Sequence, residues 1–222
     1  YIGNSDITIT NFKTGVVLAT TTSNDFGDFT IPDDAALGGA EYIMITSSGG
    51  IDFATLEPVG NKQFKTVMAA DSADPYDQST SVNILTTIMS QPLITNYLGN
   101  SSISDATLDS SILDATDKLK ENLGMTASQD IETNYLSSTR FDTTVAAPSS
   151  RLTAIINMLS HDINYETVLS NVAALMTVQQ DGTSQLTESK LSANMTTFIG
   201  GEISDSTKIA NLTTMAQNMI RV

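Results

Sequence analysis

Short runs of alternating apolar and polar residues fill the first third of the chain, and Gly, Asn and Asp residues separate the runs. An alternation of period two is typical of strands with one buried face. Gly27 can adopt the positive φ that a tight turn needs, and Pro32 has no N–H for a strand ladder, so both mark breaks between strands. The pattern predicts strands at residues 7–12, 15–21, 28–31, 42–46 and 64–68.

From residue 81 onward the apolar residues recur every three or four positions, which is typical of helices with one buried face. Pro92 is expected to interrupt the first of these helices, because proline removes a helical hydrogen bond. One-sided helices with short connections pack against one another, so we expect a compact bundle of about five or six. The expected helix starts are Ser104 or Asp105, Pro148, Asn164, and Ser204 or Asp205, and the expected stops are Gly99, Gly124 and Gly200.

This change of period predicts two domains joined by a linker. We expect residues 1–70 to form a β-sandwich, residues 71–80 a polar linker that contains a proline, and residues 81–222 a helical bundle. The predicted fold class is α+β, an N-terminal incomplete antiparallel β-sandwich followed by a C-terminal all-α helical bundle.

The predicted sandwich is short of strands, because the pattern contains five and a closed sandwich has about seven. An open edge near Ile7 is therefore expected, and exposed edge strands pair readily with other chains. Two alternatives stay open at this point. Either an earlier strand is missing from the chain, or strands between Ile51 and Gly60 escape the pattern.

Charge and composition narrow the class of partner. A formal net charge of -15 disfavours a phosphate backbone or an anionic membrane surface, so no nucleic acid is expected as a partner. No apolar run approaches the roughly 20 residues that cross a bilayer, and we expect no membrane insertion. Charged residues make up only 16% of the chain, and Ser, Thr and Asn supply much of its polarity instead. That balance favours a secreted or cell-surface location.

Residue types that carry most catalytic chemistry are scarce. The chain has no Cys, which excludes disulfides, thiolate metal sites and a cysteine nucleophile. Its single histidine, His161, precedes Asp162, and neighbours in sequence do not have the geometry of a Ser-His-Asp triad. We expect His161 to lie at a helix end, where the carbonyl groups favour a partly charged imidazole. No enzyme activity and no cofactor other than calcium is expected.

Two further candidate sites lie in predicted turns. Asn24, Asp25 and Asp28 supply the oxygen ligands that calcium prefers, although Asx turns, whose side chains accept hydrogen bonds from nearby N–H groups, account for them better. Asn100 opens an Asn-Ser-Ser sequon beside Gly99, and it is the candidate glycosylation site.

Several motifs in the first part of the chain belong together. Thr14-Gly15 occupies the first predicted turn, and residues 22–32 read TSNDFGDFTIP, close to a T-D-x-x-G-x-F-x-I-P turn. The sequence then has SGGID at 48–52 and VNILTTI at 82–88. In these motifs the chain resembles the carboxypeptidase-regulatory-like β-sandwich modules, also called prealbumin-like or B-type Cna-like, of large bacterial surface proteins. The resemblance implies extracellular adhesion or scaffolding, with no enzymatic activity of the module.

The open edge and the resemblance together predict a structural function. We expect an extracellular subunit of a fibre or surface appendage, joined to copies of itself by strand exchange at the sandwich edge. The expected assembly interface contains Tyr1, Ile2, Ile7 and Ile9. The alternative is a monomeric adhesion or ligand-binding module of a larger surface protein, with a host-surface or matrix ligand.

Overall fold

The computed structural model describes residues 2–31, 37–52, 56–70, 80–132, 142–177 and 188–220. The chain forms two compact units, Tyr1–Leu113 and Asp114–Val222. The predicted α+β class is confirmed, with two antiparallel sheets in the first half followed by helices. Residues 71–79 of the predicted linker lie outside the described residues, and the domain division at residue 70 stays a prediction. Among the described helices, none has both the length and the apolar character needed to span a membrane.

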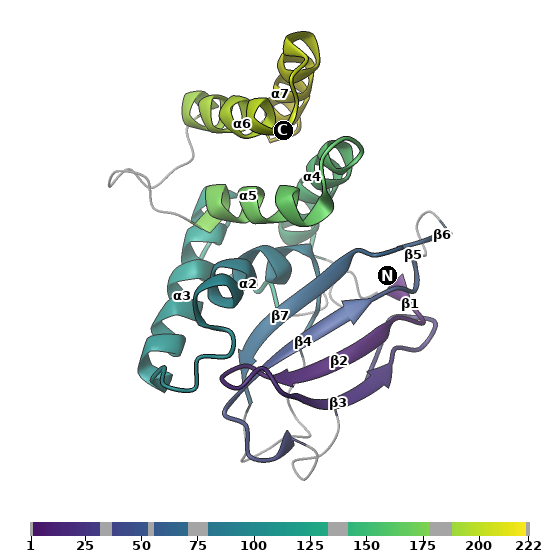
Figure 1. Cartoon of the computed structure of the whole chain (residues 1–222), viewed down its shortest axis with the longest axis vertical. Coiled ribbons are helices and arrows are strands. Elements are labelled where there is room, and N and C mark those ends of the chain that lie inside the picture. Colours follow the sequence, from purple (N-terminus) through teal and green to yellow (C-terminus); the bar gives the residue numbers. More distant parts are fainter. Residues whose placement is uncertain are drawn as a thin grey trace. The chain divides into compact units, whose positions relative to one another are not determined.

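The larger sheet has four antiparallel strands in the order β3-β2-β4-β7 (Figure 1). Four of the five strands predicted from alternation are confirmed here. One face carries the apolar residues of the alternating pattern, since Ile9 pairs with Ile45 and both are buried. The strands are β2 (Asp6–Asn11), β3 (Val17–Thr22), β4 (Tyr42–Ser48) and β7 (Gln63–Ala69).

A smaller sheet has three strands of two residues each, β1 (Ile2–Gly3), β5 (Ile51–Asp52) and β6 (Glu57–Pro58), in the order β1-β5-β6. Two of these strands lie between residues 51 and 60, so the alternative of unrecognised strands there is confirmed. A strand of two residues shows no alternation, which explains why the pattern did not reveal it.

The core of the larger sheet is built from β-branched and other aliphatic side chains on one face. Ile7 and Ile9 of β2 and Ile43 and Ile45 of β4 are almost fully buried there. Phe29 and Ile31 pack against this cluster. Burial of each large aliphatic side chain contributes about 1.5 to 3 kcal/mol to stability. The other members are Leu37 and Ala40, with Leu18, Ala19, Met68, Ala70 and Val82 partly buried beside them.

The strand predicted at residues 28–31 is wrong, because this segment is not in a ladder. The side chain of Asn24 accepts hydrogen bonds from the N–H groups of Phe26 and Asp28, at 2.8 and 2.9 Å, which holds a turn. The chain leaving this turn inserts Phe29 and Ile31 into the core without pairing with a neighbouring strand.

Helix α2 (Ile84–Tyr97) completes the first unit together with the start of α3 (Asp105–Asn122). A capping box at Asn83 and Thr86 satisfies the first N–H groups of α2. The predicted interruption at Pro92 is wrong: the helix continues through it, with Leu93 buried behind it, since packing against the sheet outweighs the lost hydrogen bond. The expected stops at Gly99 and Gly124 are confirmed, because both have positive φ just after a helix end.

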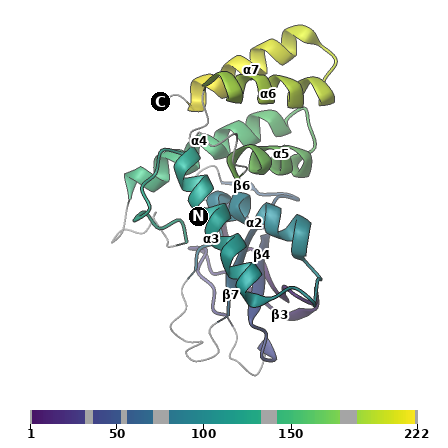
Figure 2. The same cartoon turned by 90° about the vertical axis from the view of Figure 1, so that its left-hand side faces the viewer.

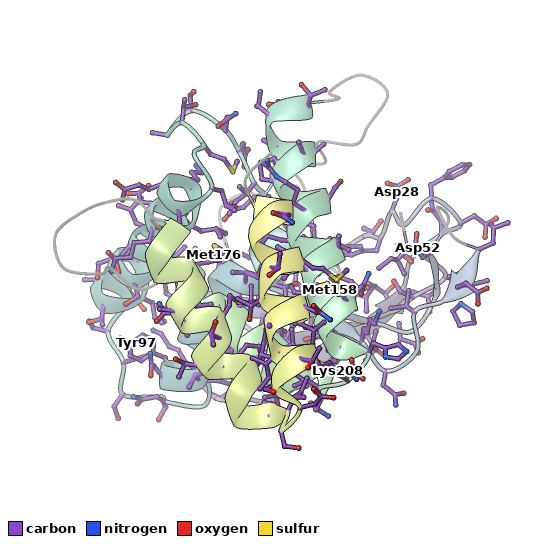
Figure 3. The ribbon with its side chains drawn as sticks, turned by 90° about the horizontal axis from the view of Figure 1, so that it is seen from above. Asp28, Asp52, Tyr97, Met158, Met176 and Lys208 are labelled. Carbon is purple, nitrogen blue, oxygen red and sulfur yellow. The ribbon has the colours of Figure 1, made fainter. Side chains whose placement is uncertain are left out.

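The second unit contains α4 (Thr143–Ser160), α5 (Tyr165–Thr177), α6 (Glu188–Glu202) and α7 (Ser206–Ile220). Figure 2 shows α6 beside α7 and α4 beside α5. The predicted caps at Asn164 and Asp205 are confirmed, as each side chain accepts hydrogen bonds from the first turn of its helix. Lys208 on α7, labelled in Figure 3, forms a salt bridge of 2.6 Å with Asp162, which lies just beyond the end of α4.

Two expected helix ends in the second unit are wrong. Helix α4 does not start at Pro148 but five residues earlier, where Asp142 accepts a hydrogen bond from the N–H of Thr144. Helix α6 runs through Gly200 to Glu202. In both cases buried side chains of the same helix, such as Val145 in α4 and Ile199 in α6, stabilise the helix despite the weak helix former.

Gly50 passes close to the start of the chain, which gives a test of this packing. An alanine Cβ at Gly50 would lie 2.6 Å from the Gly3 carbonyl oxygen, whereas one at Gly49 meets nothing within 4 Å. Both residues have positive φ. We expect Gly49→Ala to lower the free energy of unfolding by about 1 to 2 kcal/mol through backbone strain alone. Gly50→Ala should cost about 1 to 3 kcal/mol more. Equal losses in urea unfolding would contradict the close approach.

Candidate functional site

The two edges of the four-stranded sheet differ in whether another element covers them. At one edge, helix α2 lies beside β7 (Figure 1) and covers its backbone. The Lys65 N–H donates to Thr87 Oγ1 at 2.9 Å, and the Val67 N–H donates to Ser90 Oγ at 2.9 Å. Both hydroxyl side chains are completely buried. Two side chains of a helix thus take the place of a neighbouring strand.

The spacing of these hydroxyls follows from the geometry of both elements. Outward N–H groups of a strand recur at every second residue, and Thr87 and Ser90 are three apart, on one face of α2. Thr87 Oγ1 also donates to the Asn83 carbonyl oxygen at 2.6 Å, so its hydroxyl bridges helix and strand. A buried N–H without an acceptor costs about 1 to 3 kcal/mol, so the N–H groups at this buried edge need the acceptors that α2 provides.

At the opposite edge, β3 has no such cover. Among the described residues, no strand pairs with its outer side and no side chain accepts from its outward N–H groups. The Ser23 N–H donates to the Ser5 carbonyl oxygen at 3.0 Å, in the same register as the Ile7–Thr21 pair. Because bonded pairs alternate along antiparallel strands, the N–H and C=O groups of Thr20 and Thr22 point out of the sheet.

The sequence of β3 lacks charged residues and proline, two of the features that usually protect an edge. Its six residues read VLATTT, and no charged residue or proline occurs from Thr14 to Asn24. A bulge opposite Ile9 and Thr10 displaces the strand near Leu18 only. Val16 and Val17 are 57% and 55% exposed. The free edge of β3 is therefore the candidate functional site.

The residues predicted for assembly lie elsewhere. Ile7 and Ile9 are buried on β2, which has β3 on one side and β4 on the other, so their strand is central and not an edge. Ile2 is half-buried in β1 and pairs with Asp52 of β5. Tyr1 lies outside the described residues. The expected open edge at Ile7 is thus wrong in position, because strand order depends on contacts between distant segments.

The segment from Ile2 to Ser5 is fastened within its own chain. The Asn4 N–H donates to the Asn24 carbonyl oxygen at 3.1 Å, and the Ser5 N–H donates to Ser23 Oγ at 2.9 Å. The hydroxyls of Ser5, Ser23 and Ser47 form a buried chain of hydrogen bonds, 2.9 and 3.0 Å long. These contacts anchor the segment to the residues that follow β3 and to β4.

The calcium candidates form the Asx turn described above. Asn24 Oδ1 already accepts from two backbone N–H groups, and its amide donates to Asp28 at 3.3 Å. The amide of Asn4 donates to Asp25 at 2.9 Å. In the described ranges, no group of three His, Asp or Glu side chains is arranged to hold a metal ion. Asp28 is labelled in Figure 3.

Asn100 and His161, the other residues considered from the sequence, are exposed. Asn100 lies in the turn after α2, and its side chain accepts a hydrogen bond from the Ser102 N–H at 3.1 Å. This places the sequon on an accessible turn, and its glycosylation stays a prediction. His161 is the C-cap residue of α4, which confirms its expected place at a helix end.

A polar cluster that sequence reasoning missed joins the sheet to the start of α3. Lys13 forms salt bridges with Glu41, at 2.7 Å, and with Asp105. The Tyr42 hydroxyl donates to Asp109 at 2.6 Å. Burial raises the pKa of Tyr42 and the Asp109 carboxylate raises it further, so the phenol stays protonated and keeps donating. The five residues come from three distant parts of the sequence, which is why no local pattern shows them.

Removing the hydroxyls that cover β7 tests the closed edge. We expect Thr87→Val and Ser90→Ala each to lower the free energy of unfolding by about 1 to 3 kcal/mol, because each leaves a buried N–H without an acceptor. Thr95→Val is the matched control, since its exposed hydroxyl bonds only within α2. It should change the stability by less than about 0.5 kcal/mol. Equal effects of Thr87→Val and Thr95→Val in urea unfolding would refute the role of Thr87.

Calcium can be tested by thermal unfolding. Since Asn24 Oδ1 is occupied by backbone donors, we expect the same melting temperature in excess calcium and in excess chelator. A ligand that binds only the folded chain must raise the melting temperature. A rise with calcium that disappears in Asp28→Asn would therefore establish a site in this turn.

Comparison of the chain with protein-family models, with curated proteins and with solved structures finds no match. The resemblance to the carboxypeptidase-regulatory-like modules therefore stays a prediction.

Proposed function

We propose that this protein is an extracellular structural subunit that assembles with copies of itself by strand pairing at the free edge of β3. The observation that carries the proposal is the contrast between the two edges. Buried hydroxyls of α2 cover the β7 edge, whereas no strand or side chain among the described residues covers the uncharged β3 edge. Proteins commonly protect such edges, and an unprotected one is a template for another strand.

Composition supports the extracellular part of this proposal. The surface polarity of the chain comes largely from Ser, Thr and Asn, and the chain contains no Cys. Its net charge of -15 keeps copies apart at long range, which favours solubility before assembly. Strand pairing needs no catalytic group, and the neutral β3 segment supplies its hydrogen-bonding groups from the backbone alone.

Charge placed on β3 tests the proposal. We expect Thr20→Lys and Thr22→Lys to abolish self-association, because edge lysines prevent strand addition. Thr214→Lys on α7 is the matched control, since it adds the same charge at an exposed helical position. Light scattering and negative-stain images of the native protein and the three variants provide the readout.

The outcomes separate the two functions considered. Assembly of the native protein and of Thr214→Lys, lost in both β3 variants, supports the proposal. Dispersed single particles of the native protein at all concentrations would instead favour a monomeric module with a host-surface or matrix ligand. Circular dichroism of the variants checks that the fold is intact.

A further inference from the structure

We infer that the partner of β3 is β3 of a second copy, paired antiparallel about a twofold axis at Thr21. This inference rests on the proposed function and specifies its contact. It also differs from the predicted strand exchange, because the start of the chain is fastened internally by Asn4 and Ser5.

The outward backbone groups of β3 are complementary to themselves in this register. Thr20 and Thr22 present their N–H and C=O groups at the free edge. Antiparallel pairing about Thr21 sets Thr20 of one copy opposite Thr22 of the other, twice, so both pairs exchange hydrogen bonds. The bulge near Leu18 lies outside the paired segment. A register centred on Thr20 would instead need Leu18 to pair.

The side chains are complementary in the same register. Thr21 faces Thr21 across the axis, and the flanking pairs are threonine with threonine and Ala19 with Ser23. Cross-strand threonine pairs are favourable, and residues 19–23, which pair in this register, all have small side chains. A symmetric contact needs a surface that is complementary to itself, and three small threonines centred on the axis meet that need.

Exposed apolar side chains lie at both ends of β3. Val16 and Val17 lie at its start, and Phe26, which is 70% exposed, lies in the turn that follows its end. In an antiparallel pair the start of one strand meets the end of the other. The contact therefore brings Val16 and Val17 of one copy to the end that carries Phe26 of its partner, where apolar burial adds to the backbone hydrogen bonds.

Charge does not oppose this contact at short range. The nearest carboxylate in the sheet is Asp6, which pairs with Thr22 from the neighbouring strand β2. With strands about 4.8 Å apart and a rise of about 3.4 Å per residue, the two Asp6 positions of a dimer are about 16 Å apart. That separation is about twice the Debye length of about 8 Å at physiological salt, so their repulsion is largely screened.

The contact closes on itself. It consumes the free edge of β3 in both copies, and the two four-stranded sheets become one continuous sheet across the axis. A symmetric contact of this kind produces a dimer and stops. A fibre would therefore be built from dimers joined through a second surface.

Single cysteines test the register, because the native chain has none. In this register, residues at position 21 face each other at about 4.5 Å between Cα atoms, within the range of a disulfide. We expect Thr21→Cys to form disulfide-linked dimers under mild oxidation. Thr20→Cys and Thr22→Cys should each stay mostly monomeric on reducing-agent-free gels, yet an equimolar mixture of the two should cross-link.

The results distinguish this inference from the proposed function. Efficient cross-linking of Thr20→Cys alone would overturn the axis at Thr21. Failure of every cysteine variant to cross-link, while the β3 lysine variants still abolish assembly, would leave the proposed function standing and remove the twofold pair. Thr214→Cys, at an exposed position on α7, is the control. If it forms disulfide-linked dimers at the same yield as Thr21→Cys, the cross-links arise from random collision and the inference is overturned.

Discussion

Every strand at the edge of a sheet carries backbone N–H groups that no strand within its own sheet accepts, and each must reach water, a side chain or another chain. In this protein the four-stranded sheet meets that constraint in two ways. At β7 the buried hydroxyls of Thr87 and Ser90 accept the outward N–H groups of Lys65 and Val67. At β3 no described residue accepts the corresponding N–H groups of Thr20 and Thr22. The need to satisfy outward N–H groups thus explains why α2 lies against β7, and it also makes β3 the candidate site for pairing with another chain.

Hydroxyl groups have the same structural use elsewhere in the first unit. Ser5, Ser23 and Ser47 share buried hydrogen bonds between segments distant in sequence, and Thr86 closes the capping box with Asn83. A hydroxyl can donate and accept at once, and it costs less to bury than a charge. This explains how a chain with few charged residues builds specific polar contacts. The Lys13 cluster, in which paired charges fasten α3, is the contrasting case.

Local patterns predicted those elements whose signals are local. The alternation of apolar residues located four long strands, and Asn164, Asp205 and Gly124 marked helix ends correctly. Pro92 and Pro148 misled the prediction, because tertiary packing carries the helices across them. The two-residue strands are too short to show a period.

The candidate site could not have been located from the sequence alone. β3 was predicted as a strand, yet only the order β3-β2-β4-β7 shows that β3 and not β2 lies at the edge. That order depends on pairings such as Ile9 with Ile45, between residues far apart in the chain. Once the order is known, the uncharged sequence of β3 indicates an edge strand without protecting charges.

The neutrality of β3 within so acidic a chain also bears on the kinetics of association. Two copies with a net charge of -15 repel each other as they approach, although the strip where they would meet carries no charge. Dissolved salt weakens the approach barrier but has little effect on backbone hydrogen bonds once formed. Ionic strength would then change how quickly copies meet much more than how long they stay together, so the salinity of the surroundings would set the pace of assembly.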